Sequence, residues 1–399
     1  MTTPNIHLII VTDRAQANLI PILQFKPDYV ALAISDDKTK HAESFIKLLK
    51  KVGQYQDHQI LQFKQVPSVG LENIQIRAME IEEQLKQQFP NATITYNATG
   101  GTKLMVLGFY DVFHQQGNSI HYTDTQHQQI EVVFPEKTTP IAIGNVLNIE
   151  SYLLSMDKQY RKHASADWEA EVKQRRALTI WLAQNNEKLH VYWSVINSLA
   201  HNALAADKRG QAPSIANPLQ TFHKNLPFKL WQTALKKCHD AGLCQWDANQ
   251  MDSLYFHNVA GAKYLSGGWL EEYIWLTASE LNCEQVWANV EFTEAQNPKD
   301  DVRNEMDCLI LHNNRLLIIE CKTSVFKADN GKGADILYRL STMAQRTGGL
   351  FGNAWLVSAR ELDEDSFNRA REYRIPSVQA GDIANMRSKI QQWMQGNDY

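Results

Sequence analysis

The sequence predicts an α/β protein with three domains, and three observations carry this prediction. The chain has 399 residues, which is too long for one hydrophobic core and indicates two or three domains. Hydrophobic residues make up 44% of it, so buried cores are feasible. Strand-like and helix-like patterns alternate at both ends, whereas the middle is mainly helical. We expect a Rossmann-like domain at 1–150, a helical, winged-helix-like linker domain at 151–265 and a second α/β domain at 266–399.

The N-terminal domain alternates strand and helix patterns from its first residues onward. Residues 7–11 are apolar and β-branched, as in a buried parallel strand, and residues 72–88 have apolar side chains at helical spacing. Such alternation predicts a doubly wound parallel sheet. The expected strands are 7–11, 29–34, 60–66, 92–96 and 119–125, and the expected helices are 15–23, 41–52, 72–88 and 103–115.

The central domain has the outline of a winged helix. Ser165 is a plausible N-cap for a first helix, and Gly242 marks the end of an amphipathic one. A helix followed by two short strands is a common outline and weak evidence of function. The expected helices are 165–183, 189–205 and 228–238, the expected strands are 243–246 and 253–256, and residues 206–218 are an expected loop.

The C-terminal domain is expected to begin with a helix at 267–273 and to contain a β-hairpin. Asn313 and Asn314 separate two apolar strand patterns and form the predicted turn. The expected strands are 285–292, 305–311, 315–322 and 354–358, and the later expected helices are 334–343 and 363–373.

Composition excludes several classes of protein. The formal net charge is -4, so binding of nucleic acid would depend on a local basic cleft with residues such as Lys322, Lys327, Lys332 and Arg339. The five cysteines contain no CxxC pair and the histidines no HxxxH pair, which disfavours a disulfide framework or a zinc site. No secretion signal and no apolar run of about 18 residues is present. We therefore expect a cytoplasmic protein that does not cross a membrane.

Charged residues at the end of the apolar hairpin predict the chemistry. Glu320 and Lys322 alternate onto one face of their strand, and the hairpin can bring Asp307 close to Glu320, with Glu305 on the face of Asp307. Carboxylate oxygens bind Mg²⁺ or Mn²⁺, and such a metal activates water and polarises a phosphate. A lysine can orient that water or stabilise developing charge. A surface ion pair is the simpler reading of Glu-x-Lys alone, but the complete pattern favours a phosphodiesterase.

The pattern resembles the PD-(D/E)xK, or restriction-endonuclease-like, nuclease superfamily. The resemblance implies that Asp307, Glu320 and Lys322 are catalytic, with Asp307, Glu320 and Glu305 as candidate metal ligands. It also implies an acidic residue on the preceding helix. Glu271 fits this position best and Glu272 is the competing choice.

A glycine-rich turn predicts a phosphate-binding loop in the N-terminal domain. The turn after the first strand lacks the GxGxxG of dinucleotide-binding domains, which disfavours a role for NAD. Gly100 and Gly101 instead follow the fourth strand and precede an apolar helix, where backbone N–H groups can bind phosphate. A plain strand–helix turn with a threonine cap is the alternative. The candidate ligand-binding residues are Thr12, Asp13, Gln16, Asn18, Asn97, Thr99, Gly100, Gly101, Thr102 and Lys103.

The segment Thr99-Gly100-Gly101-Thr102-Lys103 resembles the TGGTK signature of CARF domains, the Rossmann-like sensors of cyclic oligoadenylates made during type III CRISPR defence. A CARF domain joined to a PD-(D/E)xK nuclease resembles the ancillary nucleases of that system. The resemblance implies a homodimer activated by cyclic oligoadenylate, with cyclic tetra-adenylate the expected ring. It implies an antiviral endonuclease that uses Mn²⁺ or Mg²⁺ to cleave single-stranded RNA or DNA and nicks supercoiled duplex DNA.

Two alternatives stay open. The first is a ligand-sensing regulator that binds DNA through the winged helix and has an inactive nuclease fold. The second is a restriction-type nuclease whose N-terminal domain only packs or dimerises. The intact set of Asp307, Glu320 and Lys322 disfavours the first, and the TGGTK segment disfavours the second. The sequence leaves open the choice of DNA or RNA, the sequence preference, the ring size and whether the N-terminal domain degrades its ligand.

Overall fold

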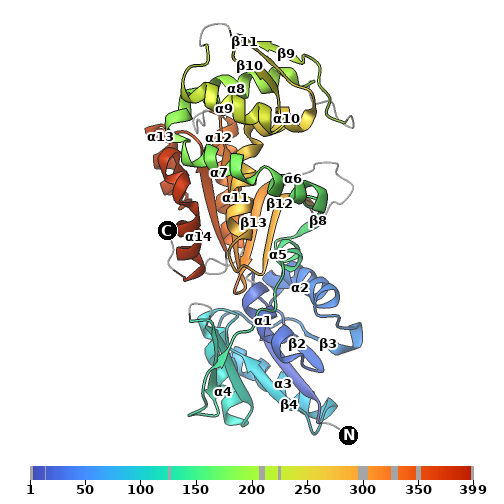
Figure 1. The fold of residues 1–399 in the computed structure, drawn as a ribbon. Coiled ribbons are helices and arrows are strands. Elements are labelled where there is room, and N and C mark those ends of the chain that lie inside the picture. Colours follow the sequence, from blue (N-terminus) through green and yellow to red (C-terminus); the bar gives the residue numbers. More distant parts are fainter. Residues whose placement is uncertain are drawn as a thin grey trace.

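A computed structural model describes residues 3–13, 15–124, 127–205, 212–222, 226–294, 304–324, 331–346 and 352–396. Figure 1 shows that the order of the domains in space differs from their order in the sequence. The N-terminal sheet lies at one end, the central segment lies at the other, and the C-terminal sheet lies between them.

The N-terminal domain is a doubly wound sheet with the strand order β3-β2-β1-β4-β5-β6-β7. The strands from β3 to β5 are parallel, whereas β6 and β7 add an antiparallel edge that the sequence patterns did not predict. Only four residues separate β5 from β6, so these strands can pair only as a hairpin. The strands are β1 (Asn5–Ile10), β2 (Tyr29–Ala33), β3 (Ile60–Phe63), β4 (Thr93–Asn97), β5 (Ser119–Asp124), β6 (Gln129–Phe134) and β7 (Ile141–Ala142).

Helices cover both faces of this sheet. Apolar residues of α3 and α4 pack on one face, and those of α1 and α2 pack on the other. The helix α5 packs beside α1 and α2 and leads the chain out of the domain. The helices are α1 (Ala15–Phe25), α2 (Thr39–Lys51), α3 (Leu71–Gln88), α4 (Lys103–Gln115) and α5 (Ile149–Ser155).

The central segment forms a winged-helix-like module. Its small sheet has the order β10-β11-β9, with helices packed beside it. The single helix expected at 165–183 is two helices, because Arg175 has non-helical backbone angles between them. The elements are α6 (Ala166–Gln174), α7 (Arg176–Gln184), α8 (His190–Ala203), β9 (Leu219–Thr221), α9 (Leu230–Asp240), β10 (Gln245–Asp247), β11 (Gln250–Tyr255) and α10 (Val259–Lys263).

The C-terminal sheet has the order β16-β15-β14-β13-β12-β8. Its edge strand β8 (Lys158–Lys162) comes from the segment between α5 and α6, within the expected linker domain. The helix α11 packs on one face of the sheet and α12 on the other. The remaining elements are α11 (Trp269–Ser279), β12 (Gln285–Glu294), β13 (Asn304–His312), β14 (Arg315–Lys322), α12 (Gly331–Arg346), β15 (Gly352–Ser358), α13 (Glu364–Glu372), β16 (Ser377–Gln379) and α14 (Met386–Met394).

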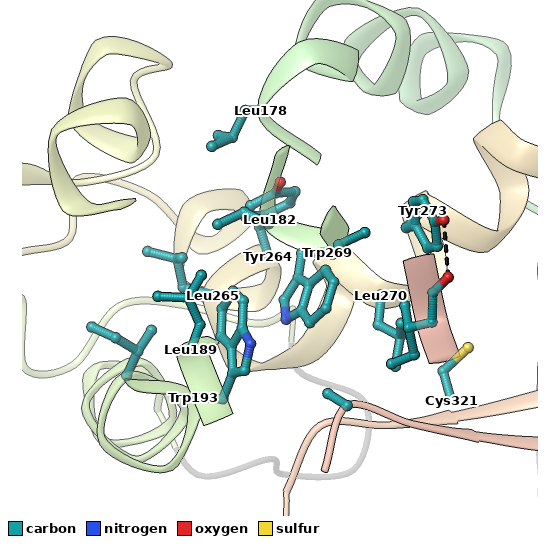
Figure 2. Close-up of a cluster of buried hydrophobic side chains, with 14 of the residues drawn as sticks. Leu178, Leu182, Leu189, Trp193, Tyr264, Leu265, Trp269, Leu270, Tyr273 and Cys321 are labelled. Carbon is teal, nitrogen blue, oxygen red and sulfur yellow. Dashed lines mark hydrogen bonds between the residues drawn. The ribbon is translucent and has the colours of Figure 1, made fainter. Parts of the chain in front are cut away.

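Two hydrophobic cores connect the domains. One core runs from α1, α2 and α5 to one face of the C-terminal sheet. The other joins the central module to the opposite face, and Figure 2 shows Trp193 of α8 beside Trp269 of α11. Their rings stack with centroids 4.4 Å apart. The base of α11 is therefore held by the central module as well as by the sheet.

The α/β class and the doubly wound N-terminal sheet are confirmed, whereas the exact boundaries at 1–150, 151–265 and 266–399 stay predictions. Thr125 of the expected fifth strand, Arg14 in the turn after the first strand and residues 206–211 of the expected central loop lie outside the described residues. Within the described part of the chain, no helix is long and apolar enough to cross a membrane.

Candidate functional site

The hairpin of β13 and β14 brings Asp307 and Glu320 together. Both turn residues, Asn313 and Asn314, have positive φ angles of 49° and 54°, as a two-residue hairpin turn requires. Cys308 pairs with Ile319, so the same register places Asp307 opposite Glu320. One Asp307 carboxylate oxygen accepts a 2.6 Å hydrogen bond from the backbone N–H of Cys321. This bond holds the Asp307 side chain against β14.

Glu320 is paired with two cations. The ammonium of Lys322 donates to its Oε1 at 2.8 Å, and the guanidinium of Arg339, on α12, donates to its Oε2 at 2.9 Å. Glu320 is only 5% exposed. A buried carboxylate needs such charged hydrogen-bond donors to offset its loss of hydration. Lys322 gains from the pair as well: burial lowers its pKa, but Glu320 and Asp307 reverse this and raise the pKa above its usual value.

Glu271 and Glu272 have different environments although they are adjacent on α11. Glu272 is buried and accepts a 2.8 Å hydrogen bond from Nε of Arg175, so it belongs to a structural ion pair. Burial, followed by the charges of Asp307 and Glu305, raises the pKa of Glu271. Burial and the nearby Glu320 likewise raise the pKa of Asp307. The structure thus places Glu271, and not Glu272, in the electrostatic field of the hairpin carboxylates.

Glu271 and Glu305 line a cavity of about 600 Å³ between α6, α10, α11 and the sheet, here called the Glu271 cavity. Lys263 and Arg175 also line it. Burial and the nearby Glu291 raise the pKa of Glu305. The cavity is large enough for part of a nucleotide and presents carboxylates beside the hairpin.

The chemistry of these carboxylates, though not their present arrangement, suits a hard divalent cation. Glu271, Asp307 and Glu305 have raised pKa values because burial and neighbouring carboxylates oppose their ionisation, and a bound cation would relieve the repulsion. No three such carboxyl, histidine or cysteine groups converge into a metal-binding cluster among the described residues. Glu320 would have to exchange Lys322 or Arg339 for the metal, because those cations occupy both of its oxygens.

The second candidate site lies at the carboxyl ends of β1 and β4. These strands are neighbours, and the order of the sheet reverses between them, which is where open α/β sheets bind ligands. A side chain at Gly100 would come within 2.5 Å of the Ile10 carbonyl oxygen. Gly101 has φ +103° and packs on the Ile10 side chain. Both glycines therefore let the loop after β4 lie directly on the end of β1.

Buried polar side chains hold this loop. Asn97 Oδ1 accepts a 2.5 Å hydrogen bond from the Thr99 hydroxyl, and the Thr99 hydroxyl accepts from the Thr123 backbone N–H at 2.8 Å. Asn18 donates to the Ile10 carbonyl at 3.0 Å. Thr102 caps α4, as its hydroxyl accepts from the Met105 N–H at 3.3 Å.

The predicted ligand-binding residues therefore divide into two groups. Gln16, Asn18 and Asn97 are at most 2% exposed and make contacts within the protein. Because these three side chains are buried, they suit a role in positioning the loops. The residues of the second group lie at the surface or are partly exposed: Thr12, Asp13, Thr99, Gly101, Thr102 and Lys103. Gly100, between them in the chain, is buried.

Sequence patterns did not reveal the contact of Arg339 with Glu320, although Arg339 was expected in a basic cleft. A side chain on a later helix reaches the hairpin only through tertiary packing. Of the other expected cleft residues, Lys327 lies outside the described residues, as does the side chain of Lys332.

Comparisons with known proteins agree with this geometry. Residues 6–152 match the family model of the Card1 CARF domain, and residues 259–397 match that of the Card1-like endonuclease domain. The chain is similar in fold to protein VC1899 of Vibrio cholerae, with a TM-score of 0.77, 20% identity and 98% of both chains covered. It is also similar to Can2 of Sulfobacillus thermosulfidooxidans in complex with cyclic tetra-adenylate, with a TM-score of 0.74 and 22% identity over 98% of this chain and 97% of Can2. Curated protein sequences give no significant match.

Proposed function

The chain belongs to the Card1 CARF domain family over residues 6–152 and to the Card1-like endonuclease domain family over residues 259–397, and from this we propose that it is a metal-dependent nuclease activated by cyclic oligoadenylate. The position of Asp307, Glu320 and Lys322 close together at the end of one hairpin carries the nuclease part of the proposal. The position of the TGGTK loop at the sheet's switch point carries the ligand-sensing part.

Asp307 and Glu320 are the proposed ligands of Mn²⁺ or Mg²⁺, with Glu305 a third candidate. The metal, when bound, polarises a phosphate oxygen and lowers the pKa of a water molecule. Lys322, which lies beside Glu320, would be able to donate to the attacking water or to the phosphate. Glu271 is a further acidic residue beside the reacting phosphate, and its raised pKa leaves it able to hold a proton near neutral pH.

The ligand of the N-terminal domain is proposed to be cyclic tetra-adenylate, the ligand in the Can2 complex. Thr12, Asp13, Thr99 and Thr102 supply polar groups, and the exposed Lys103 supplies positive charge at the start of α4. Backbone N–H groups at a helix start favour anions, which suits the phosphates of such a ring.

A homodimer is proposed through the exposed apolar side chains beside this loop. Thr102 donates to the Ser68 carbonyl at 3.4 Å, so the start of α3 lies next to the start of α4. Val69 is 72% and Leu107 57% exposed, which is unusual for a cluster of large apolar side chains. A second copy of the chain would cover them, and a cyclic tetranucleotide with two-fold symmetry could contact both loops. The exposed residues are Val69, Leu71, Ile76, Met79, Leu104 and Leu107.

The substrate is proposed to be single-stranded RNA or DNA, with nicking of supercoiled DNA, in cytoplasmic type III CRISPR defence against viruses. The decisive experiment incubates the protein with labelled single-stranded RNA, single-stranded DNA and supercoiled plasmid, with Mn²⁺ or Mg²⁺ and with or without each cyclic oligoadenylate. We expect cleavage only with both metal and activator. Absence of metal-dependent cleavage under every condition would contradict the proposal.

The winged-helix-like module favours a second candidate, a ligand-responsive regulator that binds DNA without cleaving it. Gel-shift and cleavage assays on the same duplex distinguish the two functions. Activator-dependent binding to duplex DNA with no cleavage in any metal would favour the regulator.

A further inference from the structure

A second polar cavity lies between the central module and the C-terminal sheet. It has a volume of about 540 Å³ and is here called the α8 cavity. Ser266 lines both this cavity and the Glu271 cavity, so the two are neighbours. The side chains that line the α8 cavity include Ser194, Asn197 and His201 of α8, with Ser266, Ser324 and Arg360.

Strand pairing places Arg360 beside the nuclease hairpin. Ser358, at the end of β15, pairs in parallel with Lys322, at the end of β14. The backbone N–H of Ala359 donates to the Lys322 carbonyl at 2.7 Å, and Arg360 follows directly. Ser324 lies two residues after Lys322 and lines the same cavity as Arg360. The α8 cavity thus begins where the proposed catalytic strand ends.

The chemistry of the cavity suits an anion. Nη1 of Arg360 is buried and has no hydrogen-bond partner among the described residues. A buried guanidinium N–H without a partner is unfavourable, and an anionic oxygen would complete it. Serine hydroxyls add further donors, and the described lining of the cavity contains no aspartate or glutamate. The side chain of Asn197, which also lines the cavity, is held by a hydrogen bond in which its Nδ2 donates to Thr323 Oγ1 at 3.1 Å.

We propose that the α8 cavity binds a backbone phosphate of the substrate strand next to the phosphate that is cleaved. Arg360 donates to the phosphate oxygens, and the hydroxyl of Ser324 donates beside it. This proposal rests on the proposed nuclease function and extends it to the central module, which forms one wall of the substrate path. A local cation at this position also accounts for how a chain of net charge -4 can hold a nucleic acid.

The test uses the full chain with Glu320→Ala, so that bound substrate is not cleaved. Fluorescence anisotropy measures the affinity of this chain for a labelled single strand, with saturating cyclic tetra-adenylate, over a range of salt concentrations. Adding Arg360→Ala is expected to weaken binding about tenfold. Loss of one phosphate contact is also expected to lower the salt slope, which is the steepness of log affinity against log salt concentration, by about 0.7. Arg360→Lys is expected to retain part of the affinity, because charge remains but the bidentate geometry is lost.

Arg387→Ala is the matched control. Arg387 pairs with Glu280 at 3.1 Å, at the opposite end of α11 from Glu271, so its removal is expected to leave affinity and salt slope unchanged. Ser324 is exposed and provides a second variant if Arg360→Ala does not fold. Ser324→Asp is expected to weaken binding by repelling the phosphate, whereas the neutral Ser324→Asn is expected to bind more tightly than Ser324→Asp.

The outcomes separate the two proposals. Unchanged affinity and salt slope in folded Arg360→Ala, with the wild-type chain cleaving normally, would overturn the phosphate subsite alone. If Arg360→Ala does not fold, equal affinities of Ser324→Asp and Ser324→Asn would overturn it. A third outcome would be that the wild-type chain does not cleave the strand and the Glu320→Ala chain does not bind it. The proposed nuclease function would then be wrong, and the phosphate subsite with it.

Discussion

Gln16 and Ser155 connect the ligand-sensing domain to the segment that leads into the C-terminal sheet: the Gln16 amide donates to the Ser155 hydroxyl at 2.8 Å. Gln16 lies four residues after Thr12, in the segment that follows β1. The hydroxyl of Ser155 donates in turn to the Tyr152 carbonyl at 2.7 Å. The first turn of α1, which follows the predicted ligand-binding residues Thr12 and Asp13, is therefore tied directly to α5.

The contacts continue from α5 to the nuclease hairpin. The Tyr152 hydroxyl, buried in the core between the domains, donates to the backbone carbonyl of Asn314 in the hairpin turn. The side chain of Asn314 accepts from the Leu147 N–H at 3.0 Å. A movement at the start of α1 can thus reach the strands that bear the proposed catalytic residues without crossing solvent.

Tyr152→Phe is expected to weaken the coupling between the two sites. The variant removes the hydrogen bond to Asn314 and keeps the apolar packing of the ring. We expect activator affinity within about twofold of wild type and maximal activator-stimulated cleavage several-fold lower, because coupling through such contacts is typically about 0.5–2 kcal/mol. Calorimetry and a cleavage titration measure the two quantities. Tyr160→Phe, which removes a contact with His163 instead, is the control, and equal stimulation in both variants would contradict the coupling.

Glu320→Ala is expected to abolish cleavage, because it removes a proposed metal ligand and the partner of Lys322. The loss is expected to be about 10²–10³-fold or greater, as for removal of a central electrostatic group from an active site. Circular dichroism and activator binding check that the variant is folded. Rates within threefold of wild type would remove Glu320 from the mechanism.

Lys103→Glu is expected to weaken binding of the cyclic activator about tenfold or more, because it reverses a charge at the start of α4. Lys26→Glu makes the same charge change at an exposed residue between α1 and β2, at the end of the sheet remote from the ligand loops, and is the control. Calorimetry measures both affinities. Equal affinity of the two variants would show that the loop at Lys103 is only a structural turn.

The stability of the metal-free protein is expected to depend on pH through Glu271. Its pKa rises from 4.5 to about 8 on folding, so the folded chain binds the proton more tightly than the unfolded chain does. Stability therefore falls as the pH rises from about 4.5 to 8. Glu271→Gln cannot ionise and is expected to have the higher melting temperature at pH 8 and a shallower pH dependence. Melting curves in EDTA from pH 5 to pH 8.5 measure this, and parallel curves for the two proteins would refute it.

Arg339→Ala is expected to increase the affinity for Mn²⁺. Arg339 occupies one oxygen of Glu320 and is one of the two cations that a metal could displace, so its removal is expected to lessen this competition. We expect a dissociation constant about tenfold or more lower in calorimetric titrations without substrate, since a charge-assisted hydrogen bond contributes roughly 1.5–3 kcal/mol. Arg371→Ala, on the surface of α13, is the control. Unchanged or weaker binding by Arg339→Ala would show that the guanidinium does not compete with the metal.

Local patterns in the sequence predicted the elements that bear both sites. The predicted bounds of α4 and β14 agree with the structure, because a capping threonine and an Asn-Asn turn are short-range signals. The sequence patterns did not predict the strands β6 and β8. For β8 the reason is that it is the polar run Lys158-Gln159-Tyr160-Arg161-Lys162. It becomes a strand because β12 offers it an edge, which no local pattern records.

The sequence by itself determined that carboxylates and a lysine stand at the end of one hairpin and that a glycine-rich loop precedes α4, because both depend on residues close together in the chain. Only the tertiary structure decided that Glu272 belongs to Arg175 while Glu271 faces the hairpin, and that Arg339 and Arg360 approach it. Those contacts join residues far apart in the chain, and they form because apolar faces of helices and strands pack together and carry their polar side chains to one place.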